Sequence, residues 1–212
     1  KLEISDEPLD IRRLIESVDH MSNSLSSRKN IDFKTEVGDI ANPYVYCDEL
    51  HAGEVLINLT SNAVKYTPSG GKVRFRVNQT GAVTDGTSVF RFDVEDNGIG
   101  MSEEFQQHLF EAFSREKTST VSKQQGAGLG LSIVKKIVDL AGGTISVNSK
   151  QNEGSTFSIE IPLRVMDEEA IRKYKENNKQ NINKFLGNKK FLAYPSLAFI
   201  ISSSFILLVE FS

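Results

Sequence analysis

Cysteine and tryptophan are scarce in this chain of 212 residues, which contains one cysteine, Cys47, and no tryptophan. A single cysteine cannot form a disulfide within the chain, so the sequence is typical of a protein from a reducing compartment. No cluster of cysteine and histidine has the spacing of a zinc site. An excess of positive charge is also missing: the net charge is -3 and the pI about 5.7, which argues against nucleic acid as the main partner.

The beginning of the sequence, Lys1 to Ile4, has neither an initiator methionine nor the apolar core of a signal peptide. We therefore interpret the chain as a piece of a longer protein. Its composition, 39% hydrophobic and 25% charged, excludes wholesale disorder. The length allows one domain with an appendage, or two small domains.

Hydrophobic periodicity predicts helices and short strands in mixed order. We expect helices over 9–29, 48–66 and 129–140, and a short helix from about residue 102. The strands are expected at 31–35, 44–46, 72–79, 88–95, 144–149 and 155–161, with a loop at 81–87. This order is not the strict alternation of a doubly wound parallel sheet. It predicts a two-layer α/β sandwich, with one mixed, mostly antiparallel sheet covered on one face by three helices.

The composition changes after Pro162. We expect a domain over 1–163, a charged linker or frayed helix over 164–190, and an apolar tail over 191–212. Residues 191–209 contain no charged side chain. Three interpretations of this tail stay open: a transmembrane segment, the broken start of a following domain, or a gene-boundary artefact.

The first candidate motif lies on the helix expected over 48–66, which places Asn58, Asn62, Lys65 and Tyr66 on one side. Two amides four residues apart can offer oxygen atoms to a hard cation such as Mg²⁺, and the lysine ammonium suits a phosphate. Taken alone, the pattern also fits an ordinary solvated helix face.

The second motif, Asp96-Asn97-Gly98-Ile99-Gly100, follows directly on a predicted strand. Two glycines separated by one residue let the backbone turn tightly and come close to a flat ligand. A carboxylate at a strand end can accept a hydrogen bond from an exocyclic amino group such as that of adenine. An ordinary turn has a similar composition.

The third motif precedes the helix expected over 129–140 and reads Gly126-Ala127-Gly128-Leu129-Gly130-Leu131. Glycines at a helix N-terminus expose backbone N–H groups, and the helix dipole favours a polyphosphate there. The spacing is neither the Walker pattern nor the dinucleotide fingerprint, because no strand leads into it.

In this order, the three motifs resemble those of the catalytic and ATP-binding domain of sensor histidine kinases. That family belongs to a superfamily with gyrase, heat-shock chaperone and mismatch-repair ATPases. The resemblance covers about residues 1–163 and extends to Phe110, Phe113 and Gly154-Ser155-Thr156. It implies the Bergerat-type ATP-binding fold, with ATP and Mg²⁺ as cofactors.

The resemblance also implies roles for the matching residues. Asp96 would bind the adenine amino group, in a pocket shaped by Gly98 and Gly100. Asn58 and Asn62 would face Mg²⁺ and the phosphates. Lys65 would contact a phosphate and Tyr66 would lie beside the nucleotide. The remaining implied nucleotide contacts are Ile99, Met101, Phe110, Gly126, Ala127, Gly128, Leu129, Gly130, Leu131 and Thr156. The segment 114–125 would be a mobile ATP lid, and Arg115 would reach toward the γ-phosphate.

Asn58 separates the branches of this superfamily. In the related hydrolases this position is a glutamate that acts as general base on water, and an amide cannot take a proton. The residue therefore favours a phosphoryl donor, with Asn58, Lys65 and Arg115 as the predicted catalytic residues. A module that only senses ATP and a superfamily ATPase are the alternatives.

The chain has three histidines, His20, His51 and His108, and none is followed by the acidic residue, leucine and arginine typical of a phosphoacceptor. The resemblance therefore implies that the acceptor histidine lies on a helical hairpin absent from this chain, which also dimerises the parent kinase. It further implies a response regulator as downstream partner, a monomeric isolated domain and no nucleic acid. The expected location is cytoplasmic, in a parent kinase that can be membrane-anchored upstream.

Overall fold

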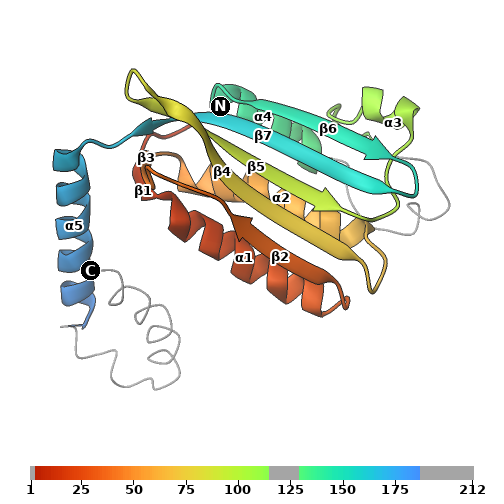
Figure 1. Cartoon of the computed structure of the whole chain (residues 1–212), viewed down its shortest axis with the longest axis horizontal. Helices are drawn as coiled ribbons and strands as arrows, with labels where there is room; N and C mark the ends of the chain where they lie inside the picture. Colours follow the sequence, from red (N-terminus) through yellow and green to blue (C-terminus); the bar gives the residue numbers. More distant parts are fainter. Residues whose placement is uncertain (1–2, 115–128, 187–212) are drawn as a thin grey trace. The chain divides into compact units, whose positions relative to one another are not determined.

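The computed structural model describes residues 3–114 and 129–186 (Figure 1). The chain divides into two compact units, residues 1–166 and 167–212. The first unit contains a seven-stranded sheet and four helices in its described part. In chain order these elements are β1 (Pro8–Asp10), α1 (Ile11–Ser27), β2 (Asp32–Val37), β3 (Tyr44–Tyr46), α2 (Glu49–Tyr66), β4 (Lys72–Thr84), β5 (Thr87–Asp96), α3 (Glu103–Gln107), α4 (Gly130–Leu140), β6 (Thr144–Lys150) and β7 (Gly154–Val165).

The strands follow the order β1-β3-β7-β5-β4-β2, and β6 also pairs with β7. Only the β2–β4 pair is parallel among these strands; the others are antiparallel. β7 has neighbours along both edges: β5 runs along one edge, while β6 and β3 share the other. The predicted mixed, mostly antiparallel sheet is confirmed.

Helices α1, α2 and α4 cover one face of the sheet (Figure 1). Alternate strand residues point into this layer, and Phe75, Phe90 and Ile159 are completely buried there. Val55 and Leu59 of α2 and Val134 of α4 complete the core from the helix side. The expected two-layer sandwich with three covering helices is therefore confirmed.

The opposite face of the sheet carries charged side chains that pair with one another across the strands. Arg76 Nε lies 2.9 Å from Glu36 Oε2, and its Nη1 lies 2.5 Å from Glu95 Oε2. Arg91 pairs in the same way with Asp93 and Glu160. The charged side chains on this face form ion pairs with one another across the strands. The face can therefore stay exposed to water and needs no covering layer.

The structure corrects the expected loop at 81–87, most of which belongs to strands β4 and β5. Asp85 and Gly86 alone form the hairpin turn, with φ of 50° and 71°. Gly81, at φ 77°, begins a register irregularity between Thr80 and Thr84. Gly81, Asp85 and Gly86, which adopt positive φ in this segment, therefore form a bulge and a two-residue turn.

Cys47 lies in the core beside the N-cap of α2. Desolvation, together with the nearby charge of Asp48, raises the pKa of its thiol to about 12. Asp48 caps the helix, because its Oδ1 accepts a hydrogen bond of 2.9 Å from His51 N.

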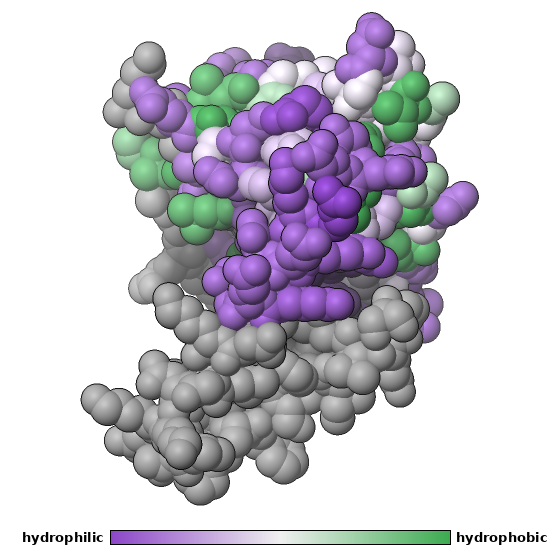
Figure 2. Space-filling view, turned by 90° about the vertical axis from the view of Figure 1, so that its left-hand side faces the viewer, coloured by the Kyte–Doolittle hydropathy of each residue, from purple (hydrophilic) through white to green (hydrophobic). Residues whose placement is uncertain are grey.

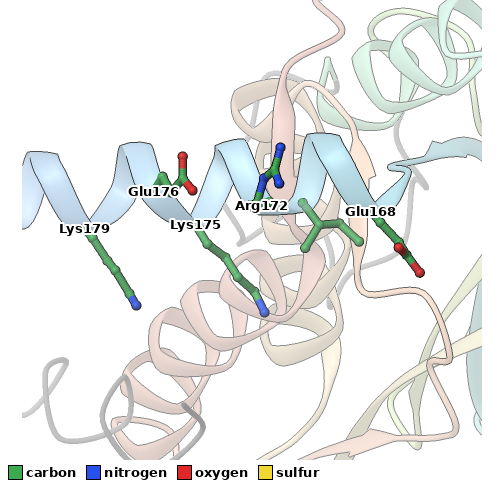
Figure 3. A pocket seen from close by; sticks show the side chains of 6 residues that line it. Glu168, Arg172, Lys175, Glu176 and Lys179 are labelled. Carbon is green, nitrogen blue, oxygen red and sulfur yellow. The ribbon is translucent and has the colours of Figure 1, made fainter.

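The second unit contains α5 (Glu168–Leu186), where the sequence predicted a linker or frayed helix. Asp167 Oδ1 accepts a hydrogen bond of 2.7 Å from Ala170 N at its start. Figure 2 shows hydrophilic residues over the surface of this helix. Among the described residues, those that line a hollow along this helix all belong to α5, and they include Arg172 and Lys175 (Figure 3).

The apolar tail at 191–209 lies outside the described residues. Within residues 3–114 and 129–186, no helix is both long enough and apolar enough to cross a membrane.

Candidate functional site

A buried carboxylate marks the end of β5. Asp96 is only 8% exposed to solvent. Its Oδ1 accepts a hydrogen bond of 2.8 Å from Gly98 N. Burial raises its pKa to about 6, although hydrogen bonds from the backbone of Gly98 and Ser155 act in the opposite direction. Asp96 is therefore a fixed acceptor just below the surface, ionised above pH 6.

The segment after Asp96 is held from two sides. Ile99 N donates to Tyr66 O at the end of α2, at 3.2 Å. Asn152 N in the β6–β7 turn donates to Ile99 O at 2.7 Å, and Met101 N donates to Ser149 Oγ at 2.9 Å. The loop 97–101 is thus fastened between α2 and the β6–β7 hairpin.

Three glycines allow this close packing of backbone segments. A Cβ on Gly98 would lie 2.6 Å from Tyr66 O, and one on Gly100, at φ 60°, would lie 2.0 Å from Lys150 O. A Cβ on Gly154, at φ 112°, would lie 2.0 Å from Asp96 O. The sequence suggested glycines that admit a flat ligand; the structure shows that they also admit the protein's own backbone.

The polar side of α2 presents half-buried side chains at Asn58, Asn62 and Lys65. Asn58 Nδ2 donates to Glu54 O at 3.0 Å, and Asn58 Oδ1 faces the first residue of α4, since a Cβ on Gly130 would lie 2.7 Å from it. The described residues contain no group of three or more His, Cys, Asp or Glu that could hold a metal ion. Amide oxygens such as those of Asn58 and Asn62 are ligands of the kind that Mg²⁺ takes in proteins.

The last turn of α2 carries Lys65 and Tyr66. The Lys65 ammonium lies 5.1 Å from the centroid of the Tyr66 ring. Lys29, from the end of α1, donates from Nζ to Val64 O at 2.9 Å and to Lys65 O at 2.5 Å. The positive charge of the Lys29 ammonium stabilises the last carbonyl groups of α2, where the helix dipole is negative, and so stabilises this turn.

The structure does not bring every predicted residue to this site. Thr156 pairs with Glu95 and Asn148, so it lies on the ion-paired face of the sheet, opposite to Asp96. The neighbouring Ser155 is buried and pairs directly with Asp96. Ser155 and Ser149 were missed by the sequence analysis, although a polar residue at a core-facing strand position was the available signal.

Some of the remaining predicted residues are described by the structure, and the others lie outside the described residues. Met101, Phe110 and Leu131 are partly buried against the core, and Leu129 immediately precedes α4. Phe113 is 73% exposed, at φ 66°. Outside the described residues lie Arg115, Gly126, Ala127, Gly128 and the predicted lid apart from Ser114.

Comparison with known proteins gives one matching family model, described as "Histidine kinase-, DNA gyrase B-, and HSP90-like ATPase", over residues 47–165. The sensory/regulatory protein RpfC of Xanthomonas campestris is 33% identical over 165 residues, which are 78% of this chain and 23% of that protein. The autoinducer 2 sensor kinase/phosphatase LuxQ of Vibrio parahaemolyticus is 30% identical over 77% of this chain and 19% of its own length. The chain therefore spans less than a quarter of these relatives.

Two solved structures extend the likeness to three dimensions. The catalytic domain of histidine kinase ThkA has a TM-score of 0.60 and 30% identity, covering 76% of this chain and 96% of its own. Full-length ShkA in complex with AMPPNP has a TM-score of 0.65 and 29% identity, covering 78% of this chain and 32% of that one. The predicted resemblance and the ATP-binding character of the family are confirmed.

The packing of Gly154 generates a stability prediction. We expect Gly154→Ala to lower the free energy of unfolding by about 3 kcal/mol or more, because the new Cβ has no room and the backbone is strained. Gly81→Ala is the matched control: Gly81 also has a positive φ, but nothing lies within 4 Å of its added Cβ. It should lose only about 1 kcal/mol. Urea unfolding measures both, and equal losses would contradict the proposed close contact.

Proposed function

We propose, from the premise that this chain belongs to the family of histidine kinase-, DNA gyrase B- and HSP90-like ATPases, that it is the phosphoryl-donor domain of a sensor histidine kinase. It binds ATP and passes the γ-phosphate to a histidine on a helical hairpin outside this chain. The observation that carries the proposal is Asp96, a buried carboxylate fixed at a strand end inside a glycine-bearing loop.

The Asp96 carboxylate recognises the base. Its orientation is fixed by Gly98 N, and it accepts a hydrogen bond from the exocyclic amino group of adenine. Guanine has a carbonyl oxygen at the corresponding position, which a carboxylate repels. When guanine is bound, the buried Asp96 carboxylate has no hydrogen-bond donor opposite it, which costs binding free energy. Discrimination against guanine therefore follows from the charge of one side chain.

The polar side of α2 binds the phosphate end. The amide oxygens of Asn58 and Asn62 suit Mg²⁺, and the Lys65 ammonium suits a phosphate oxygen. Bound Mg²⁺ would neutralise negative charge on the phosphoryl group during transfer. The residues of this chain bind, orient and charge-balance the triphosphate, and we assign no proton abstraction to them.

Asn58 supports transfer to a protein rather than hydrolysis. An amide cannot accept a proton from water, so this position supplies no general base. Glu54, one turn earlier, is exposed. The sensor kinases among the relatives further support a dimeric parent protein that hands the phosphoryl group to a response regulator, with this domain itself monomeric.

Phosphotransfer in trans tests the proposal. The chain is mixed with γ-labelled ATP, Mg²⁺ and the purified phosphoacceptor hairpin of a sensor histidine kinase whose acceptor histidine is established. We expect an acid-labile, alkali-stable label on this hairpin, and none on a hairpin whose acceptor histidine is replaced by glutamine. Labelled free phosphate without a labelled hairpin would indicate an ATPase, and binding without either product would indicate an ATP-sensing module.

The raised pKa of Asp96 gives a pH prediction for nucleotide binding. As the pH falls through about 6, the Asp96 carboxylate gains a proton and becomes a poorer hydrogen-bond acceptor for the adenine amino group. The ADP affinity should therefore be about tenfold lower at pH 5 than at pH 7.5. Asp96→Asn should bind ADP about 5- to 150-fold more weakly at pH 7.5, the equivalent of about 1–3 kcal/mol. Isothermal titration calorimetry measures both proteins. The variant shows only the titration of ADP itself, and identical pH profiles would disprove the role of Asp96.

The metal role of Asn58 gives a second binding prediction. In Asn58→Ala, the gain in ADP affinity on adding Mg²⁺ should shrink about three- to tenfold, because one amide ligand is lost. Adenosine, which carries no phosphate, should bind the variant and the wild type equally. Glu54→Gln is the control on the same helix and should retain the full Mg²⁺ effect. Equal losses for ADP and adenosine would place Asn58 away from the metal.

A further inference from the structure

Three polar side chains form a row across the core-facing side of the sheet, at one end of β5, β7 and β6. Asp96 pairs with Ser155, and Ser155 pairs with Ser149. Elsewhere on this face the same strands carry mainly apolar residues, such as Val94, Phe157 and Val147, and Ser88 at the other end of β5 is an exception. Each strand therefore interrupts its apolar alternation at the same level, which packing alone does not require.

Ser149 uses its complete hydrogen-bonding capacity at this point. Its Oγ accepts a hydrogen bond of 2.9 Å from Met101 N and lies 3.0 Å from Gly154 O and 2.9 Å from Ser155 Oγ. A hydroxyl has one donor and two acceptor lone pairs. The consistent assignment has Ser149 donating to Gly154 O while accepting from Met101 N and from the Ser155 hydroxyl. No capacity remains for a ligand.

The Ser149 hydroxyl therefore joins two segments that border Asp96. Met101 is the far end of the loop 97–101, and Gly154 begins β7 directly against Asp96 O. Gln106 strengthens the same junction, because its Nε2 donates to Met101 O at 3.2 Å and to Ser149 O at 3.1 Å. The near end of the loop is held by the Asp96–Gly98 hydrogen bond.

We propose that Ser149 is a positioning residue for the base-binding side of the site. Its hydroxyl fixes the loop 97–101 against the β6–β7 hairpin, so that Asp96 and Gly98 are already in place before a nucleotide binds. The effect on ligand affinity rests on the proposed nucleotide binding. The hydrogen bonds of the Ser149 hydroxyl to Met101 N, Gly154 O and Ser155 Oγ, which we call the hydroxyl clip, are present in the free protein. Valine, which fits the alternation of β6, would fill this space and leave Met101 N–H unpaired.

The experiment compares wild type, Ser149→Ala, Ser149→Thr and Ser146→Ala. Thr retains the hydroxyl, and Ser146 is an exposed serine of the same strand. Calorimetry with Mg²⁺-ADP and with inorganic tripolyphosphate separates base binding from phosphate binding. We expect Ser149→Ala to lose about tenfold in ADP affinity, equivalent to about 1.4 kcal/mol, while its tripolyphosphate affinity is unchanged. The Thr variant and the Ser146 variant should bind ADP as the wild type does.

Hydrogen exchange of the Met101 amide in nucleotide-free protein provides the readout that does not depend on ATP. In the wild type this amide should exchange as slowly as amides inside β7, and in Ser149→Ala at least tenfold faster. A fast-exchanging Met101 amide in the wild type would overturn the proposal, even if the alanine variant does not fold. Unchanged ADP affinity and unchanged exchange in Ser149→Ala would also overturn it. If the wild type shows slow exchange but no ADP binding, the proposed function fails while the hydroxyl clip stands.

Discussion

Keeping the Asp96 carboxylate charged below the protein surface is the constraint to which the surrounding structure responds. Its pKa shift from 3.8 to about 6 means that the ligand-free fold loses about 3 kcal/mol as the pH rises through this range. Hydrogen bonds from Gly98 N–H and from the backbone of Ser155 keep this cost from being larger, because they lower the pKa against the effect of burial. A ligand that donates a hydrogen bond to the carboxylate recovers part of it, so destabilisation and recognition have the same origin.

The two faces of the sheet contribute to the site in different ways. The face covered by α1, α2 and α4 supplies a rigid platform, because the buried side chains of Phe90 in β5 and Ile159 in β7 fix two of the strands whose ends carry the polar row. The ion pairs of Arg76 and Arg91 on the open face are exposed, and pairs of this kind contribute little stability individually. Their effect is to keep that face polar without a covering layer.

The sequence predicted the layers well because the period of the apolar residues shows which side of each helix or strand is buried. The buried sides must face one another in the fold. It predicted α2 and its polar side for the same reason. The prediction of a loop at 81–87 was wrong because Gly81 and Gly86, like other residues that permit positive φ, occur in bulges and turns as well as in loops. Thr156 was selected as part of a short motif, whereas strand alternation places Ser155 and Ser149 beside Asp96. Which hydroxyl faces the site depends on strand register, which the motif does not contain.

The burial of Cys47 has a practical consequence for spectroscopy. The sole thiol of the chain is enclosed in the core and has a pKa of about 12, so thiol-reactive dyes leave it unmodified at neutral pH. A cysteine introduced at the exposed Thr84, beside the β4–β5 turn, would then be the single labelled position. It lies at the far end of the hairpin from Asp96, about 30 Å away along β5. A fluorophore there reports the tumbling of the domain, and its docking on larger proteins, without touching the base-binding loop.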